Sequence, residues 1–218
     1  MAVLDPLPAK VLAVRLISNI SSGLAEMLKL RPEQRSLGLI TSDNDDACYV
    51  SIDEATKMAD VEVVYAHSFY AGASHASGQL SGEIIAMLAG PTPEEVRAGL
   101  DAAIRYLTSK ALWYSANQDD TIAFFPHVIS QTGAYLSKVC DISLGSPIAY
   151  LIAPPLEGVF ALDKALKTAA VKIASYTAPP SETNYMGVIL TGDQASCHAA
   201  AVAFQETVLE VAARPVDY

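Results

Sequence analysis

The chain has 218 residues, of which 51% are hydrophobic and 17% are charged, and its formal net charge at pH 7 is −10. This acidity leaves no basic surface for a phosphate backbone, which argues against nucleic-acid binding. Cys48, Cys140 and Cys197 are widely spaced and form no CxxC pair, which is typical of a reducing cytosol and argues against a disulfide scaffold. Small, polar or helix-breaking residues interrupt the uncharged stretches at 63–82 and 143–156, so these stretches predict no membrane span.

Strands and helices alternate along the first half of the chain. The predicted elements are a strand over 14–20, a helix over 24–28, a short helix over 53–60, a strand over 61–64, a strand over 84–90 and a helix over 93–107. Asp53 has a side chain suited to cap the short helix. Thr92, Pro93 and Glu95 supply an N-cap, a proline at the first helical position and a capping-box glutamate. Apolar residues follow them at helical spacing.

The second half repeats the first. Residues 162–173 match residues 52–63 at an offset of 110, with Asp, Ala, Lys, Ala and Val recurring in order. The predicted elements of this half are a strand over 125–130, a helix over 134–138, a helix capped by Asp163, a strand over 171–173, a strand over 188–192 and a helix capped by Asp193. We therefore predict an α/β (α+β) fold made of two copies of one domain, residues 1–110 and 111–218. A trimer of such chains would close six similar domains into a ring.

Two long connections occupy equivalent places in the two copies, residues 65–78 and 176–185. Both contain many small residues or prolines, and the first is rich in Gly, Ala and Ser. Loops longer than the usual connection are more often functional than short ones. The alternative is that both are solvated connections without a further role.

Several stretches resemble a known family. They are Arg35–Ile40, Asp45-Asp46, Asp53–Lys57, Val61–Tyr65, Tyr70–Gly72, Gly99–Asp101, Ser137, Tyr150–Glu157 and Pro179–Tyr185. With them the whole chain resembles the trimeric, tandem-domain shell proteins of bacterial microcompartments, of the ethanolamine-utilisation type. The resemblance implies two circularly permuted microcompartment domains, a pseudohexameric homotrimer that packs edge to edge with other shell proteins, and a place in the microcompartment shell of the cytoplasm. It implies no catalysis and no cofactor.

The resemblance also implies a small pore within each protomer that is associated with ethanolamine. The residues that we expect to line it are Asp45, Asp46, Tyr70, Glu83, Trp113 and Thr183. Carboxylates bind ammonium groups through charge-assisted hydrogen bonds, and aromatic faces add cation–π attraction. Trp113 stands where relatives carry Phe, which would narrow the pore. The alternative for Asp45 and Asp46 is an exposed acidic turn.

The family's large central channel is expected to be gated by the two long loops. The gate residues would be His67, Ser68, Phe69, Gly72, His75, Gly78, Pro179, Pro180, Ser181, Glu182 and Asn184. Turn chemistry after the proline pair is an equal alternative for Glu182 and Asn184. Two loop histidines are most often solvated polar residues, so no metal site is predicted. We expect His127 and His198 to be core residues and the three cysteines to be small buried hydrophobes.

The sequence contains no recognisable catalytic motif, such as GxGxxG after a strand, a Walker loop, GxSxG or HExxH. This agrees with a structural protein. Two other classes stay open: a small-molecule sensor or regulatory binding protein with tandem α/β domains, and an enzyme with a site between domains.

Overall fold

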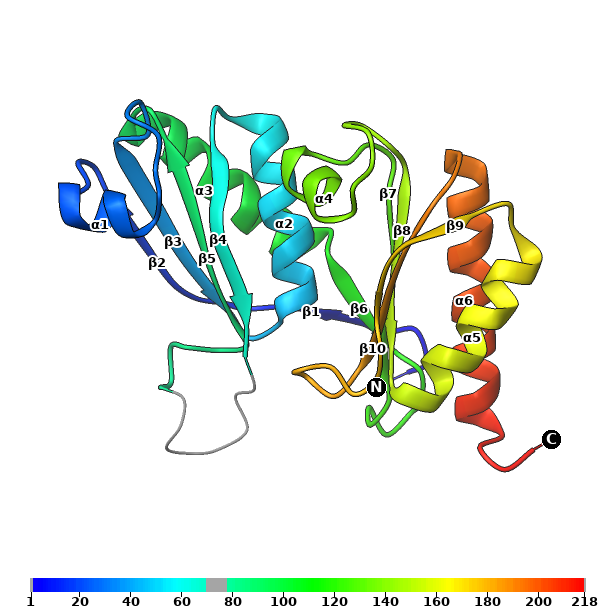
Figure 1. Ribbon diagram of the computed structural model, residues 1–218. Coiled ribbons are helices and arrows are strands. Elements are labelled where there is room, and N and C mark those ends of the chain that lie inside the picture. The colour runs from blue at the N-terminus through cyan, green and yellow to red at the C-terminus, as the bar shows by residue number, and fades with distance from the viewer. Residues whose placement is uncertain (1, 70–77, 218) are drawn as a thin grey trace. The chain divides into compact units, whose positions relative to one another are not determined.

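The computed structural model describes residues 2–69 and 78–217. In chain order the elements are β1 (Pro6–Pro8), β2 (Val11–Ile17), α1 (Ser22–Met27), β3 (Ser36–Ser42), α2 (Asp45–Met58), β4 (Glu62–Ser68), β5 (Ile84–Gly90), α3 (Pro93–Ser109), β6 (Leu112–Ser115), β7 (Ala123–Ile129), α4 (Ala134–Val139), β8 (Ile148–Ala153), α5 (Pro155–Thr168), β9 (Lys172–Thr177), β10 (Met186–Thr191) and α6 (Gln194–Ala213) (Figure 1). The α+β fold class predicted from the sequence is confirmed.

Contacts divide the chain into two compact units. The first unit contains residues 8–111 together with the short segment 133–136, and the second contains residues 1–7, 112–132 and 137–218. The division of the chain at residue 110 stays a prediction.

The two units repeat one antiparallel sheet. The first unit has the strand order β2-β3-β5-β4, and the second has β7-β8-β10-β9, to which β6 and β1 add beyond β7. Matching strands and helices follow in the same chain order, with α2 and α3 in the first unit corresponding to α5 and α6 in the second. The repeat seen in the sequence is therefore a repeat of topology.

Helix packing against the sheet explains the apolar pattern of each unit. In β5, Ile84, Ala86 and Leu88 are buried at alternate positions, as expected for a strand with one face on the core. At Gly38 in β3, a Cβ would lie 2.8 Å from side-chain atoms of Val96 and Leu100 of α3. In the second unit Phe124, Leu151 and Phe204 belong to the corresponding buried core.

Two of the four predicted helix caps are present and two are wrong. Thr92 accepts a hydrogen bond from the Glu95 amide at 3.3 Å, and Asp193 accepts one from the Ser196 amide at 2.6 Å. Asp53 and Asp163 instead lie inside helices, because α2 and α5 begin two turns earlier than predicted. Asn44 caps α2 by accepting from the Ala47 amide. Pro154 precedes α5, in which a further proline occupies the first turn.

Other local predictions have mixed outcomes. The strands β4 and β9 extend through Ser68 and Thr177, so the long connections begin later than predicted. The three cysteines are buried, as predicted. His198 is exposed on α6, so its assignment to the core was wrong. Among the described residues, no helix combines the length and the apolar character that a membrane span requires.

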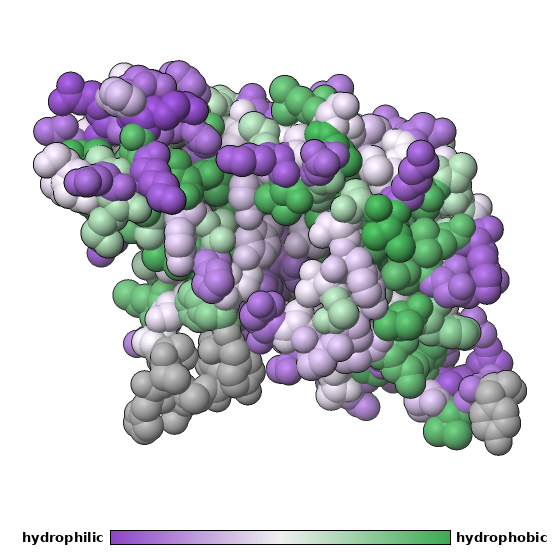
Figure 2. All heavy atoms as spheres, in the orientation of Figure 1, coloured by the Kyte–Doolittle hydropathy of each residue, from purple (hydrophilic) through white to green (hydrophobic). Residues whose placement is uncertain are grey.

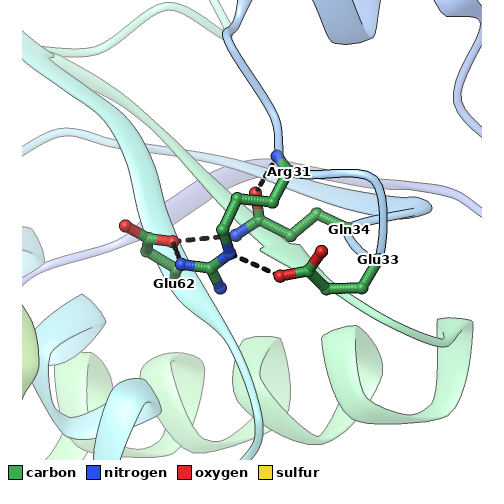
Figure 3. Close-up of polar contacts among 4 residues, drawn as sticks. All are labelled: Arg31, Glu33, Gln34 and Glu62. Atoms are coloured by element: carbon green, nitrogen blue, oxygen red, sulfur yellow. Dashed lines mark hydrogen bonds and ion pairs between the residues drawn. The ribbon is translucent and has the colours of Figure 1, made fainter.

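A polar network fixes the segment that leads into β3. Arg31 pairs with Glu33 at 2.7 Å and with Glu62 of β4 at 2.9 Å, as Figure 3 shows. Gln34, which is only 5% exposed, donates to the same Glu62 carboxylate at 2.8 Å. Exposed ion pairs alone contribute little, but here they accompany a buried amide whose hydrogen bonds must be satisfied.

Asp53 of α2 holds the segment 133–136 in the first unit. Its two carboxylate oxygens accept hydrogen bonds from the backbone amides of Gly133 (2.7 Å) and Leu136 (2.8 Å). Thr56, one turn further along α2, accepts from the Ala134 amide at 2.9 Å. These bonds satisfy amides at the start of α4 that no preceding turn can satisfy. The cap of α4 therefore comes from a residue about 80 positions earlier in the chain.

Replacement of Gly133 by Ala should destabilise the protein, because the new Cβ would lie 2.4 Å from the Asp53 carbonyl oxygen and the Thr56 hydroxyl. We expect a loss of about 1–3 kcal/mol in the free energy of unfolding, measured by urea denaturation. The control is Gly23→Ala in α1, where a Cβ would meet nothing within 4 Å. Equal stabilities of the two variants would contradict this account of the Asp53 contact.

Candidate functional site

Four acidic side chains gather in the first unit where three elements end or begin. Asp43 follows β3, Asp45 and Asp46 form the first turn of α2, and Glu83 precedes β5. We call these four residues the acidic cluster. The predicted pore residues Asp45, Asp46 and Glu83 thus belong to neighbouring elements, although 37 or more residues separate Glu83 from the others in the sequence.

Backbone hydrogen bonds fix Glu83 between two strands. Its amide donates to the carbonyl of Ser42 at 2.9 Å, and its carbonyl accepts from the amide of Phe69 at 3.0 Å. Gly82 precedes it with φ +64°. A Cβ at Gly82 would lie 1.9 Å from the Ser42 carbonyl oxygen, so only glycine allows the chain to pass this close to β3.

Asp45 and Asp46 are buried, with 6% and 8% of their surfaces exposed. The interpretation of the pair as an exposed acidic turn is therefore wrong. Asn44 turns the chain into α2, and the Asp45 carboxylate accepts from the Asp46 amide at 2.9 Å. Carboxylates in the first turn of a helix also interact favourably with its dipole.

Burial, together with the neighbouring negative charges, raises the pKa values of several groups in and beside the cluster. Burial, then the neighbouring carboxylates of Asp45 and Asp43, raise the pKa of Glu83 from 4.5 to about 7. Burial raises the pKa of Tyr49 to about 12, and Asp45 and Asp46 add to the effect. Cys48 shows the same pattern, with its pKa raised to about 12 by burial and by Asp45. The cluster therefore favours a bound cation or proton over a further negative charge.

Hydroxyl groups lie beside the cluster. The Tyr49 hydroxyl and the Ser68 hydroxyl are 2.5 Å apart and share a hydrogen bond, and Tyr49 stacks on Tyr135 with a centroid distance of 6.2 Å. Sequence reasoning placed Ser68 in a loop and missed Asp43, Tyr49 and Gly82. Gly82 could have been found from the sequence, because it directly precedes Glu83, an acidic residue at the start of an apolar strand.

Two predicted pore residues, Trp113 and Thr183, belong to the second unit. Trp113 of β6 is 5% exposed. It stacks on Phe125 at 5.6 Å and meets the edge of Tyr185 at 5.1 Å between centroids. Thr183 lies in a turn in which the Ser181 hydroxyl accepts from the amides of Thr183 and Tyr185. Tyr70, the remaining predicted pore residue, lies outside the described residues.

The predicted gate residues fall into three groups. His67 and Ser68 belong to β4, paired with Ile85 and Ile84 of β5, so their assignment to a loop was wrong. Phe69 and Gly78 lie in the connection, while Gly72 and His75 are outside the described residues. Pro179, Pro180, Ser181, Glu182 and Asn184 form the turn between β9 and β10, where the Asn184 amide donates to the Ser181 carbonyl.

Replacement of Glu83 by Gln should stabilise the protein at high pH and not at low pH. The folded protein holds the Glu83 proton up to about pH 7, whereas the unfolded chain releases it near pH 4.5. Wild-type stability therefore falls as pH rises through this window. We expect a gain on the order of 1 kcal/mol for Glu83→Gln above the window, discounted for partial solvent access.

The measurement is urea denaturation at a pH below about 4.5 and at a pH above about 7, the two limits set by the unfolded and folded pKa values of Glu83. The control is Glu206→Gln, an exposed position on α6. A gain for Glu83→Gln that is the same at both pH values would show that Glu83 is not the group responsible.

The chain is similar to known proteins in both its sequence and its fold. A family model described as the BMC domain matches residues 36–117 and 153–216, one match in each half of the chain. The bacterial microcompartment shell protein EutL of Clostridium perfringens is 50% identical over 214 residues, which are 98% of this chain and 99% of that protein. EutL of Salmonella typhimurium is 51% identical over 217 residues, which are 100% and 99% of the two chains.

Solved structures give the same result. The crystal structure of the ethanolamine utilization protein EutL from Leptotrichia buccalis has a TM-score of 0.96 and 52% identity, and the match covers 100% of both chains. The trimeric shell protein PduB has the same fold, with a TM-score of 0.74 at 18% identity over 94% of this chain and 89% of that one. On the tandem match and the full-length identity, the chain belongs to the BMC-domain family of bacterial microcompartment shell proteins, a family of structural proteins and not of enzymes.

Proposed function

We propose that the chain is a pore-forming subunit of the shell of an ethanolamine-utilising microcompartment, and that it works as a homotrimer. The observation that carries this proposal is the identity of about half of all residues over the full length with EutL shell proteins, one of which is named for ethanolamine utilisation. The fold shared with a shell protein described as trimeric supports the trimer.

The acidic cluster supplies the chemistry of a pore for small cations. Ethanolamine at neutral pH carries an ammonium group and a hydroxyl group. The carboxylates of Asp45, Asp46 and Glu83 offer charge-assisted acceptors for the ammonium N–H groups. The paired hydroxyls of Tyr49 and Ser68 give a polar wall beside them. The pore would select among solutes by the charge of its lining and by its width, as other channels do.

Protonation of Glu83 would compete with the bound cation. Because the pKa of Glu83 is about 7, near-neutral pH leaves part of the population protonated. A cation that binds the ionised form must displace this proton. The pore would then hold ammonium solutes more weakly in an acidified compartment than in a neutral one.

The two connections after β4 and β9 are the proposed gate of a larger channel. Both leave equivalent strands of the repeated sheet, so three copies of the chain would bring six such connections to one axis. Gate opening would be a rearrangement between two loop states, biased by any ligand that binds one state more tightly.

Asp45→Asn and Glu83→Gln should each weaken ethanolamine binding about tenfold, since each removes one charge-assisted acceptor. Isothermal titration of the assembled protein measures the dissociation constants. Asp101→Asn, an exposed position on α3, is the matched control and should leave the dissociation constant unchanged. Equal affinities for the wild type and all three variants would contradict a role of the acidic cluster in binding ethanolamine.

The same titration should depend on pH in a defined direction. We expect wild-type affinity to be weaker at about pH 6 than at about pH 8, because protonated Glu83 must release its proton on binding. The Glu83→Gln variant should lose most of this dependence. If the affinity of the Glu83→Gln variant still depends on pH to the same extent, a group other than Glu83 is responsible for the dependence.

Sedimentation velocity and electron microscopy test the assembly. We expect the mass of three chains in solution and flat arrays at high concentration. A monomer at all concentrations would overturn the proposed shell function, and a discrete oligomer that never forms arrays would favour a sensor or regulatory protein.

A further inference from the structure

The helix α5 leaves open a face that is closed in its counterpart α2. The bounds of α5 lie 110 residues beyond those of α2 at both ends, so Leu156, Phe160 and Asp163 correspond to Asp46, Val50 and Asp53. In α2 these positions are 8%, 1% and 0% exposed, whereas Leu156 is 66% and Phe160 56% exposed. The Asp163 side chain is 62% exposed. Positions that are buried on α2 of the first copy are therefore exposed on α5 of the second copy.

The exposed face of α5 carries more large apolar side chains than is usual for a helix face in contact with water. Val159 is a further exposed member, at 46%. The first turns of α5, together with Val211, Arg214 and Pro215 at the end of α6, border a cavity of about 840 Å³. In Figure 2 green, hydrophobic side chains gather over the start of α5. Patches of this kind on a monomer are typical of interaction sites.

The first unit shows what lies against part of the corresponding face of α2. There the segment 133–136, at the start of α4, lies on α2 and is held by the Asp53 carboxylate, and Tyr135 stacks on Tyr49. The counterpart of α4 in the repeat is α1, whose bounds lie 112 residues earlier at both ends. The helix α1 has no buried residue, and its N-cap residue Ser21 makes no side-chain capping bond. Met27 is 80% exposed.

We infer that the exposed face of α5 binds α1 of a second copy of the chain, with Asp163 capping α1 as Asp53 caps α4. This inference rests on the proposed trimer and names the surfaces that form it. Asp163 would accept from the amides of Ser21 and Leu24, the counterparts of Gly133 and Leu136. Its negative charge suits the N-terminal end of a helix. Leu156, Val159 and Phe160 would pack against the apolar residues of α1.

Two local differences shape this contact. Ser21 stands in the place of Gly133, so the two backbones lie farther apart by the room that a Cβ needs. Asp163 is paired with Lys167 at 2.5 Å, an exposed ion pair that costs little to exchange for backbone donors. The contact joins different surfaces on the two copies, which is the heterologous type that closes into a ring.

Substitutions on the face test the inference by the mass of the assembled protein. Asp163→Ala and Phe160→Ser should each raise the concentration at which half of the trimer dissociates by about tenfold or more. Both residues are exposed, and circular dichroism checks that the variants fold. Asp101→Ala, an exposed helical aspartate on α3, is the matched control. A trimer that is unchanged in both variants would overturn the inference.

A cross-link gives a second readout that does not depend on weakening the assembly. The double variant Ser21→Cys with Asp163→Cys should form covalent products of two and three chains on a non-reducing gel, since the natural cysteines are buried. Each single variant should not. A trimeric double variant whose chains stay separate on the gel would overturn the inference alone, whereas a monomeric wild type would overturn the proposed function as well.

Discussion

The buried carboxylate of Asp53 is the constraint around which the first unit is built. A carboxylate with no exposed surface is tolerated only where hydrogen bonds replace its hydration. Here two backbone amides of the segment 133–136 do so. Burial still raises the pKa of Asp53, although these two amides act in the opposite direction. Loss of either partner would leave an unpaired buried group, so α2 and the start of α4 depend on each other.

The position of α2 in turn defines the acidic cluster. The same helix that carries Asp53 in its middle carries Asp45 and Asp46 in its first turn. The close passage of Gly82 over Ser42 then brings Glu83 beside them. The cluster is therefore formed by one helix and one turn at the end of a sheet. Burial of Glu83, followed by the nearby carboxylates of Asp45 and Asp43, raises the pKa of Glu83 to about 7.

The first turns of the two corresponding helices differ between the copies. Where α2 begins with Asp45 and Asp46, α5 begins with Pro155 and Leu156. The shared sheet order shows that the scaffold is common to both copies, while these first turns differ in chemistry. One copy carries carboxylates in this turn, and the other carries exposed apolar side chains. A trimer of tandem chains can therefore use its two copies for different tasks, which six identical domains could not do.

The sequence by itself determined the repeat, the fold class, the strand at Ile84–Gly90 and the caps at Thr92 and Asp193, because these depend on local periodicity and on side chains adjacent to the backbone they bind. It also selected Asp45, Asp46 and Glu83 through a family resemblance. It misplaced Asp53 and Asp163 at helix ends, because an aspartate inside a helix looks like a cap in the sequence. The partners of Asp53 lie about 80 positions away, whereas Asp163 pairs with Lys167 on the surface of its own helix. Only the tertiary structure decided that Asp53 caps α4, that the acidic pair is buried and that Gly82 aligns Glu83 with it. Each of these depends on contacts between segments far apart in the chain, and such contacts leave no local pattern.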